Sequence, residues 1–235
     1  MKKQIFIVAL VFITGLSTNL FSQDEPFRGG LFKNYGVAVK AGLYGYGFDL
    51  STSLHPNIKA RLGYNYYTYD YNSGINFDGT GLVSGNDITI TLDKANFSLS
   101  HVNLLFDFFP MQSGIFHFTA GAYFGQNQVK VMGSAPEKFA AGDYEITPIN
   151  NKFDATVKLG SSVKPYFGIG LGRTITNSRV GFKFELGVVY QGNLSIESAN
   201  ADTSGMNSEI SKLDIPTWLV KLWPMMTFSL SYRIN

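Results

Sequence analysis

Residues 163–173 read VKPYFGIGLGR, and from Val163 to Gly172 their side chains alternate without interruption between two kinds. One alternate set includes Val163, Phe167 and Leu171, whereas the other contains Lys164 and three glycines. A period of two residues is that of a β-strand with one apolar face. Which face meets water decides the class of protein, because an apolar exterior indicates a membrane barrel and an apolar interior a soluble one.

The same alternation recurs along most of the chain. Before the fourth strand, Phe97 and Leu99 carry the apolar side in the opposite phase, which predicts a β-bulge near Ser100. The sequence predicts eight strands, over residues 36–43, 46–54, 58–66, 101–108, 116–125, 153–171, 180–188 and 225–235.

The connections between these strands alternate in length. Short turns are expected near residues 55–57, 110–114 and 175–179, and a tight one at Tyr44–Gly45. Long polar loops are expected at roughly 72–94, 131–151 and 192–217, and a brief helix over 205–214 would be marginal at its length. This layout predicts an all-β fold, an eight-stranded antiparallel up-and-down transmembrane β-barrel with short periplasmic turns and longer extracellular loops.

A soluble lipocalin-like barrel would show the same period, but three features favour the membrane barrel. The polar face is rich in glycine, which suits the crowded interior of a small barrel. The chain stops on a strand that can pair with the first. Aromatic residues gather at strand ends as two interface girdles: Tyr64, Tyr66, Tyr190 and Trp223 towards long loops, and Phe108, Phe116 and Tyr232 towards short turns or the C-terminus.

The ends and the composition suggest an exported protein. Residues 1–22 have the lysines and short apolar run of a signal peptide, 23–34 form a periplasmic lead-in, and 35–235 form the barrel. The chain has no cysteine, so it has neither a disulfide nor a lipidated cysteine. Without Lys2 and Lys3 the basic and acidic residues balance at 17 each, which gives no basic footprint for nucleic acid.

Three strands carry a resemblance to a known family. Residues 164–172 (KPYFGIGLG), 184–192 (FELGVVYQG) and 230–234 (LSYRI) resemble the small outer-membrane β-barrel domain family, the OmpA-like and OmpW-like barrels of Gram-negative bacteria. The resemblance covers essentially the whole mature chain. It implies a monomer in outer-membrane lipid, placed there by the barrel-assembly machinery through the C-terminal strand. The terminal Asn235 departs from the aromatic residue that commonly ends this family.

The sequence offers little chemistry of an enzyme. Some outer-membrane barrels modify lipids, so Ser100, His101 and Asp107 deserve consideration, but adjacent strand residues point to opposite faces. The histidines lack metal-ligand spacing, and we expect no catalytic site, metal or cofactor. The tyrosines of 64–72 fit an interface belt, with stacking on a sugar or nucleobase as the alternative.

The charged residues on the polar face form the candidate site. Seven are basic and four acidic, and charges inside a narrow barrel must be paired or hydrated. The prediction is a salt-bridged plug in a barrel with a structural envelope role and no enzymatic activity; the alternative is a narrow pore for small anionic solutes. The residues are Lys40, Asp49, Lys59, Arg61, Asp107, Asp154, Lys158, Lys164, Lys183, Glu185 and Arg233.

Overall fold

The computed structural model describes residues 32, 34–81, 83–141, 144–175, 179–192, 194–197 and 221–234. The predicted signal peptide (1–22), most of the lead-in (23–34) and the predicted helix (205–214) lie outside these residues. Within them, no helix is long and apolar enough to cross a membrane.

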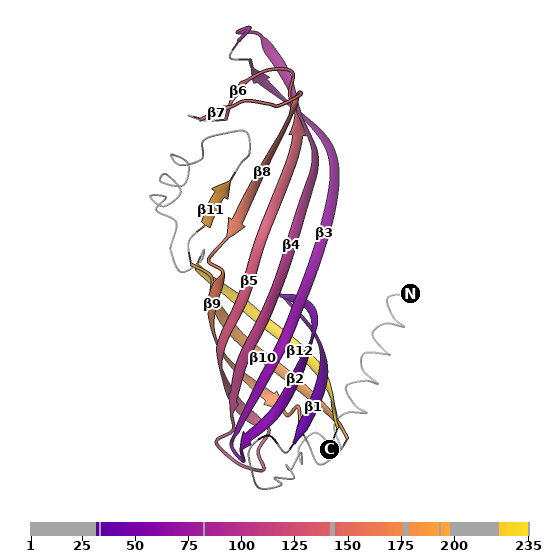
Figure 1. Ribbon diagram of the computed structural model, residues 1–235, viewed down its shortest axis with the longest axis vertical. Coiled ribbons are helices and arrows are strands. Elements are labelled where there is room, and N and C mark those ends of the chain that lie inside the picture. Colours follow the sequence, from indigo (N-terminus) through magenta and orange to yellow (C-terminus); the bar gives the residue numbers. More distant parts are fainter. Residues whose placement is uncertain are drawn as a thin grey trace, which may run out of the picture.

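Eight antiparallel strands close into a ring, which confirms the predicted barrel (Figure 1). The strand order around the ring is β1-β2-β3-β4-β5-β9-β10-β12, and the β1–β12 and β5–β9 pairs close it. The strands are β1 (Tyr35–Gly42), β2 (Gly45–His55), β3 (Ile58–Thr80), β4 (Asp87–Phe108), β5 (Phe116–Ser134), β9 (Val163–Gly172), β10 (Val180–Tyr190) and β12 (Leu222–Arg233).

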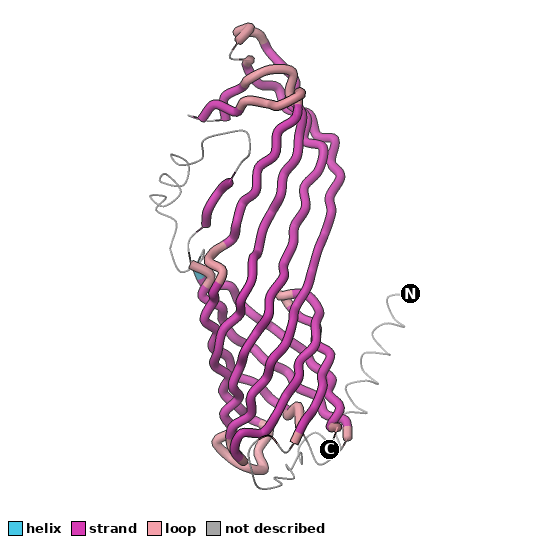
Figure 2. Tube along the Cα trace, in the orientation of Figure 1, coloured by secondary structure: helices cyan, strands magenta, loops and turns pink. Residues whose placement is uncertain are grey.

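One side of the ring continues as a sheet beyond it. β3, β4 and β5 run well past the other ring strands, and β8 (Lys152–Leu159) and β11 (Leu194–Glu197) extend this sheet beside β5 (Figure 2). A hairpin of β6 (Phe139–Ala141) and β7 (Tyr144–Ile146) lies near its tip. We call this part the extension, its end of the barrel the extended end, and the opposite end, with the short turns, the turn end.

The extension corrects three details of the prediction. The expected loop at 72–94 is mostly strand, since β3 and β4 pair as far as Thr80 and Asp87. The expected strand 153–171 is two strands, β8 and β9, because Gly160 adopts a φ of +90° between them. The expected bulge near Ser100 is absent, because β4 pairs with β3 and β5 without a register shift at that residue.

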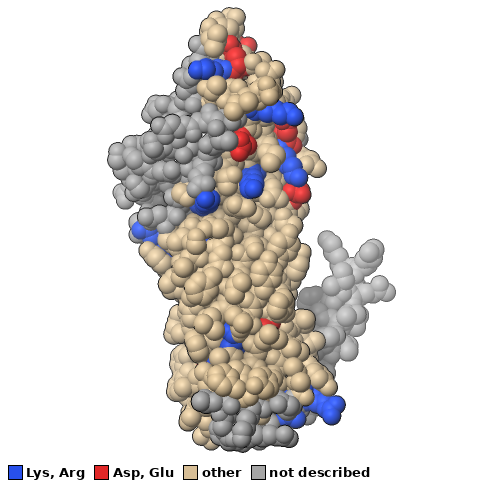
Figure 3. Space-filling view, in the orientation of Figure 1, with Lys and Arg blue, Asp and Glu red and all other residues tan. Residues whose placement is uncertain are grey.

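The ring is apolar outside and polar inside. Phe167, Ile169 and Leu171 of β9 face outward, and Phe167 is 54% exposed, whereas Lys164 is completely buried inside. In Figure 3 the charged side chains gather over the extension and near the turn end, and leave between them a belt that is almost free of charge. This is the arrangement of a membrane barrel, because a soluble calyx would bury the apolar set.

The polarity of the two faces reverses where the extension begins. On the inner face, the buried Leu99 of β4 lies between its cross-strand neighbours Tyr67 of β3 and Asn127 of β5. The next set of inner neighbours along these strands is Tyr69, Phe97 and Val129. The outward rows above the belt are polar instead: Thr68, Ser98, Gln128 and Lys158 form one, and Asp70, Asn96, Lys130 and Thr156 the next. The outer face of the extension is therefore polar and suited to contact with water, whereas its inner face is apolar.

The predicted aromatic girdles are placed as follows. Tyr64, Tyr66 and Tyr190 lie on outward positions near the extended end of the ring. The outward positions near the turn end carry Phe108, Phe116 and Tyr232. Trp223 differs from the prediction, because it faces inward and packs against the buried aromatic cluster. Its predicted place in the girdle rested on nearness to a strand end, and position along a strand does not set the face.

Candidate functional site: the interior of the barrel

The centre of the barrel holds three buried carboxylates and three buried cations in contact. Asp107 accepts from Arg61 Nη2 at 2.9 Å and from Lys183 Nζ at 2.6 Å. Glu185 Oε2 lies 2.8 Å from each of the same two side chains. Asp49 lies 2.5 Å from Lys40 Nζ and 3.3 Å from Arg61 Nη1. We call these six residues the central ion network.

Neutral hydrogen-bonding side chains complete the coordination of the network. The Thr119 hydroxyl donates to Asp107 at 2.7 Å, and the Tyr166 hydroxyl donates to Glu185 Oε1 at 2.7 Å. Asn103 accepts from Lys40 Nζ at 2.7 Å. Buried charges persist when paired and hydrogen-bonded, because the partners replace the lost water.

Glycines make room for this network on neighbouring strands. Gly63 lies directly beside Asp49 in the β2–β3 register and beside Asn103 in the β3–β4 register. A Cβ at Gly63 would collide with the Asp49 carboxylate and approach the Phe48 carbonyl oxygen to 2.5 Å. The absence of a side chain at Gly63 therefore leaves space for the Asp49 carboxylate and the Asn103 amide.

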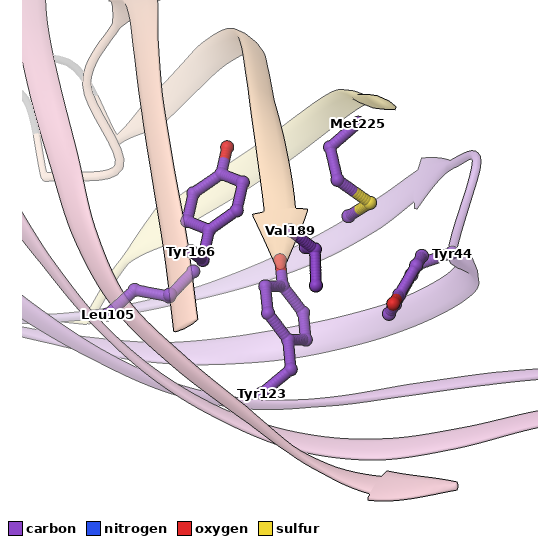
Figure 4. Packing of buried hydrophobic residues seen from close by; sticks show 6 residues of the cluster. All are labelled: Tyr44, Leu105, Tyr123, Tyr166, Val189 and Met225. Carbon is purple, nitrogen blue, oxygen red and sulfur yellow. The ribbon is translucent and has the colours of Figure 1, made fainter. Parts of the chain in front are cut away.

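An aromatic layer lies beside the network, towards the extended end of the ring, and Figure 4 shows its buried residues. Tyr44 from the β1–β2 turn contacts Tyr123 with ring centroids 5.3 Å apart, and Tyr123 contacts Tyr166 at 5.5 Å. Leu105, Val189 and Met225 complete the buried cluster, and Trp223 packs against it. The six residues of the cluster come from the β1–β2 turn, β4, β5, β9, β10 and β12, so the layer reaches across the lumen.

Arg173 lies at the turn end of the barrel and is completely buried. Its guanidinium lies 4.2 Å from the centroid of the Phe109 ring and donates to the carbonyls of Met111, Gln112 and Gly114. The φ of +102° at Gly172 ends β9 and turns the chain. Lys59 Nζ donates to the Ile175 carbonyl at 2.9 Å at the same level.

The other residues predicted to face the lumen have varied positions. Lys164 is buried in the ring near the extended end, where its Nζ donates to the Gly125 carbonyl at 2.7 Å. Asp154 and Lys158 differ from the prediction, because they lie on β8 in the extension, on its outer face. Arg233 is half-buried at the turn end, beside Gly36 of β1. The other seven are the six residues of the central ion network and Lys59.

The residues weighed for catalysis are not arranged as a catalytic group. Ser100 is on the outer face and shares a hydrogen bond of 2.9 Å with Tyr64, whereas His101 is buried inside. His101 stacks near Tyr44 with ring centroids 4.7 Å apart. A serine and a histidine on opposite faces of a strand cannot form a nucleophile–base pair.

One group of side chains has the composition of a metal site. The ligand atoms of Asp107, His117 and Glu185 lie within 4.8 Å of one another. The two carboxylates, however, are already neutralised by Arg61 and Lys183. A divalent cation there would have to displace two positive charges from buried positions, so the residues do not fit a metal.

Several residues of the interior were not anticipated from the sequence. Arg173 follows the end of the predicted strand 153–171, so the alternation did not predict whether its side chain faces inward or outward. The polar face of the predicted strands also includes Asn103, Thr119 and Tyr166. That position in the alternation was the sequence feature that could have placed them in the interior. Tyr44 lies in a turn, and nothing in the pattern indicates that a turn folds over the lumen.

Comparisons with known proteins support the architecture. No protein-family profile matches the chain, and no curated protein matches it in sequence. The crystal structure of Acinetobacter baumannii CarO2 is similar with a TM-score of 0.52 at 18% identity, over 87% of this chain and 100% of that one. A. baumannii CarO gives a TM-score of 0.50 at 20% identity, over 84% and 96%. The fold is that of an outer-membrane β-barrel. At these identities the likeness shows the fold alone.

Proposed function

We propose that this chain is an outer-membrane barrel with a closed lumen, which holds the extension at the cell surface. The observation that carries the proposal is the central ion network, since its side chains bond to one another across the lumen. Layers at both ends reinforce it, with Tyr44, Tyr123 and Tyr166 above and Arg173 below. An eight-stranded barrel is just wide enough for its own side chains.

The route to the membrane belongs to the same proposal. Residues 1–22 direct export and are removed, and the barrel-assembly machinery inserts the barrel as a monomer by reading β12. The protein then partitions with the outer-membrane fraction and migrates differently in detergent gels before and after heating. Recovery from the soluble periplasm contradicts this assignment.

Conductance in planar bilayers tests the closed lumen. The wild-type protein is expected to give no stable single-channel steps. A variant with Tyr44, Tyr123 and Trp223 replaced by alanine removes side chains of the layer at the extended end but keeps the central ion network, and it is also expected to be silent. Frequent wild-type steps of uniform size would refute the closed lumen.

A narrow anion pore is the second candidate, and the charge balance inside the ring favours it. Among the described residues, the ring buries six cationic side chains against three carboxylates. Lys59, Lys164 and Arg173, outside the central ion network, donate to backbone carbonyls. Fixed positive charge in a narrow passage concentrates anions. Any conductance would then be anion-selective, and Lys164→Gln with Lys183→Gln would reduce that selectivity. A cation-selective current contradicts both candidates.

A further inference from the structure

β3 has a free edge in the extension. Its pairing with β2 ends at Tyr66, opposite Tyr46, because β2 begins at Gly45. From Tyr67 to Thr80, β3 pairs with β4 alone among the described strands. An edge strand presents a row of backbone donors and acceptors to any chain that can add to the sheet.

The direction of the backbone groups on this edge follows from the ring. A Cβ placed on Gly47 would collide with the carbonyl oxygen of Tyr64, so that oxygen points towards β2. Backbone groups of an antiparallel strand alternate between its two sides. The amides and carbonyls of Thr68 and Asp70 therefore point to the side where β2 has ended.

The inner face of the extension is apolar and becomes more exposed towards this edge. Leu99 on β4 is 1% exposed, and Phe97 and Val129 are half-buried. On β3, Tyr69 is 56% exposed and Phe77 is 52% exposed. Inner side chains of the edge strand therefore lack the lateral neighbour that a further strand would supply.

The outer face of the same edge is acidic. The segment Thr68–Thr80 contains Asp70 and Asp78 and no lysine or arginine. Asp70 lies 3.3 Å from Lys94 Nζ, and the two side chains are 50% and 41% exposed. Such an exposed pair is weak, so Asp70 can still attract a second cation.

We propose that the β3 edge from Thr68 to Thr80 binds an extended polypeptide as an added strand. The partner has apolar side chains at alternate positions, which cover Tyr69 and Phe77, and basic side chains between them, which face Asp70 and Asp78. Backbone hydrogen bonds provide affinity in this mode, and the opposite polarity of the two faces sets the register. The proposal does not depend on whether the lumen conducts.

The test uses the full-length protein in detergent micelles and a fluorescein-labelled peptide of alternating valine and lysine, about twelve residues long. Fluorescence anisotropy is expected to show saturable binding. A peptide with glutamate in place of lysine, and one with the same composition in two blocks, are expected to bind at least about tenfold more weakly. Equal binding of either control peptide would overturn the proposal.

A matched pair of variants tests the edge itself. Thr68→Pro removes an amide that points to the free side and leaves the β4 pairing intact, and proline is tolerated at such edge positions. This variant is expected to bind the peptide about tenfold more weakly, whereas Thr68→Val binds like the wild type. Heat-modifiable migration checks that both variants fold, and equal binding by the two folded variants would overturn the proposal.

Hydrogen exchange in the wild-type protein gives a readout that needs no variant. Added peptide is expected to slow exchange at the amides of Thr68 and Asp70, because an added strand accepts from them. Unchanged exchange at saturating peptide overturns the proposal. So does a protein that is dimeric by light scattering and binds no peptide, since the edge is then occupied by a second copy.

Discussion

Arg61 on β3 and Glu185 on β10 meet across the full width of the barrel, with Nη2 and Oε2 2.8 Å apart. Three strands lie between β3 and β10 in either direction around the ring of eight, so the two residues come from opposite walls. Arg61 also contacts Asp49 and Asp107. A single guanidinium therefore connects β2, β3, β4 and β10.

Removal of this guanidinium should strongly destabilise the barrel. Arg61→Ala leaves three buried carboxylates with two cations, and the loss of one partner from a buried ion pair costs about 3–5 kcal/mol. We expect a decrease of that order in the free energy of unfolding, measured by urea titration of the folded gel band in detergent micelles.

The exposed pair Lys94–Asp70 provides the control for Arg61→Ala. Its side chains are about half exposed, so Lys94→Ala should change the free energy of unfolding by less than about 1 kcal/mol. If the two variants unfolded at the same urea concentration, the central ion network would not be a source of stability.

Gly63 should tolerate no side chain. In Gly63→Ala the new methyl group meets the Asp49 carboxylate and the Phe48 carbonyl oxygen, and the backbone cannot move without disturbing the β2–β3 register. Overpacking of this kind typically costs about 1–3 kcal/mol. Thermal unfolding of the folded gel band measures the loss.

Gly79→Ala is the matched control for the glycine prediction. The methyl group there meets the flexible end of the Ile90 side chain at 2.7 Å, and that side chain can rotate away. We expect a smaller shift in the unfolding temperature than for Gly63→Ala. A larger shift for Gly79→Ala than for Gly63→Ala would show that the residues beside Gly63 leave space for a methyl group.

Alternation predicted the ring because every ring strand has the same surroundings, with lipid on its outer face and a crowded polar interior on its inner face. Each strand therefore shows the same alternation of apolar and polar residues. Seven of the predicted strands correspond to one ring strand each, and the remaining one, 153–171, includes all of β9 except Gly172. The central ion network lies on predicted polar-face positions for the same reason. Its pairings across the lumen could not be predicted, since they depend on strand tilt and not on sequence spacing.

The errors arose where one assumption, that the outside is apolar, stops holding. Leu99 and His101 both face inward, and the apparent change of phase between them is a change of surroundings and not a bulge. The same assumption placed Asp154 and Lys158 in the lumen, although polar residues face outward in the extension. Alternation reports which residues share a face but not which face is wet.

An arginine on the outer face of the ring should be costly in the middle of the apolar belt. Phe167→Arg places a charge against lipid, which costs about 2–4 kcal/mol near the bilayer midplane. The measurement is the free energy of unfolding in lipid vesicles. Val83→Arg, at an exposed position in the β3–β4 turn, should have little effect. Equal and small effects at both positions would indicate that the belt does not face lipid.

The change of polarity along β3 should mark the membrane surface between Tyr66 and Thr68. The chain has no cysteine, so single cysteines can carry a fluorescent label at Leu62, Thr68 and Asp70. These residues share the outer face of one strand, at different heights. In vesicles, a lipid-soluble quencher should act mainly on the label at Leu62→Cys, and iodide in the water mainly on those at Thr68→Cys and Asp70→Cys. All three side chains point away from the barrel axis. A difference in quenching between the labels therefore reports how deep each lies in the membrane, and not which face of the strand it occupies. A lipid-quenched label at Asp70→Cys would place the extension inside the membrane and remove the free edge of β3 from the cell surface.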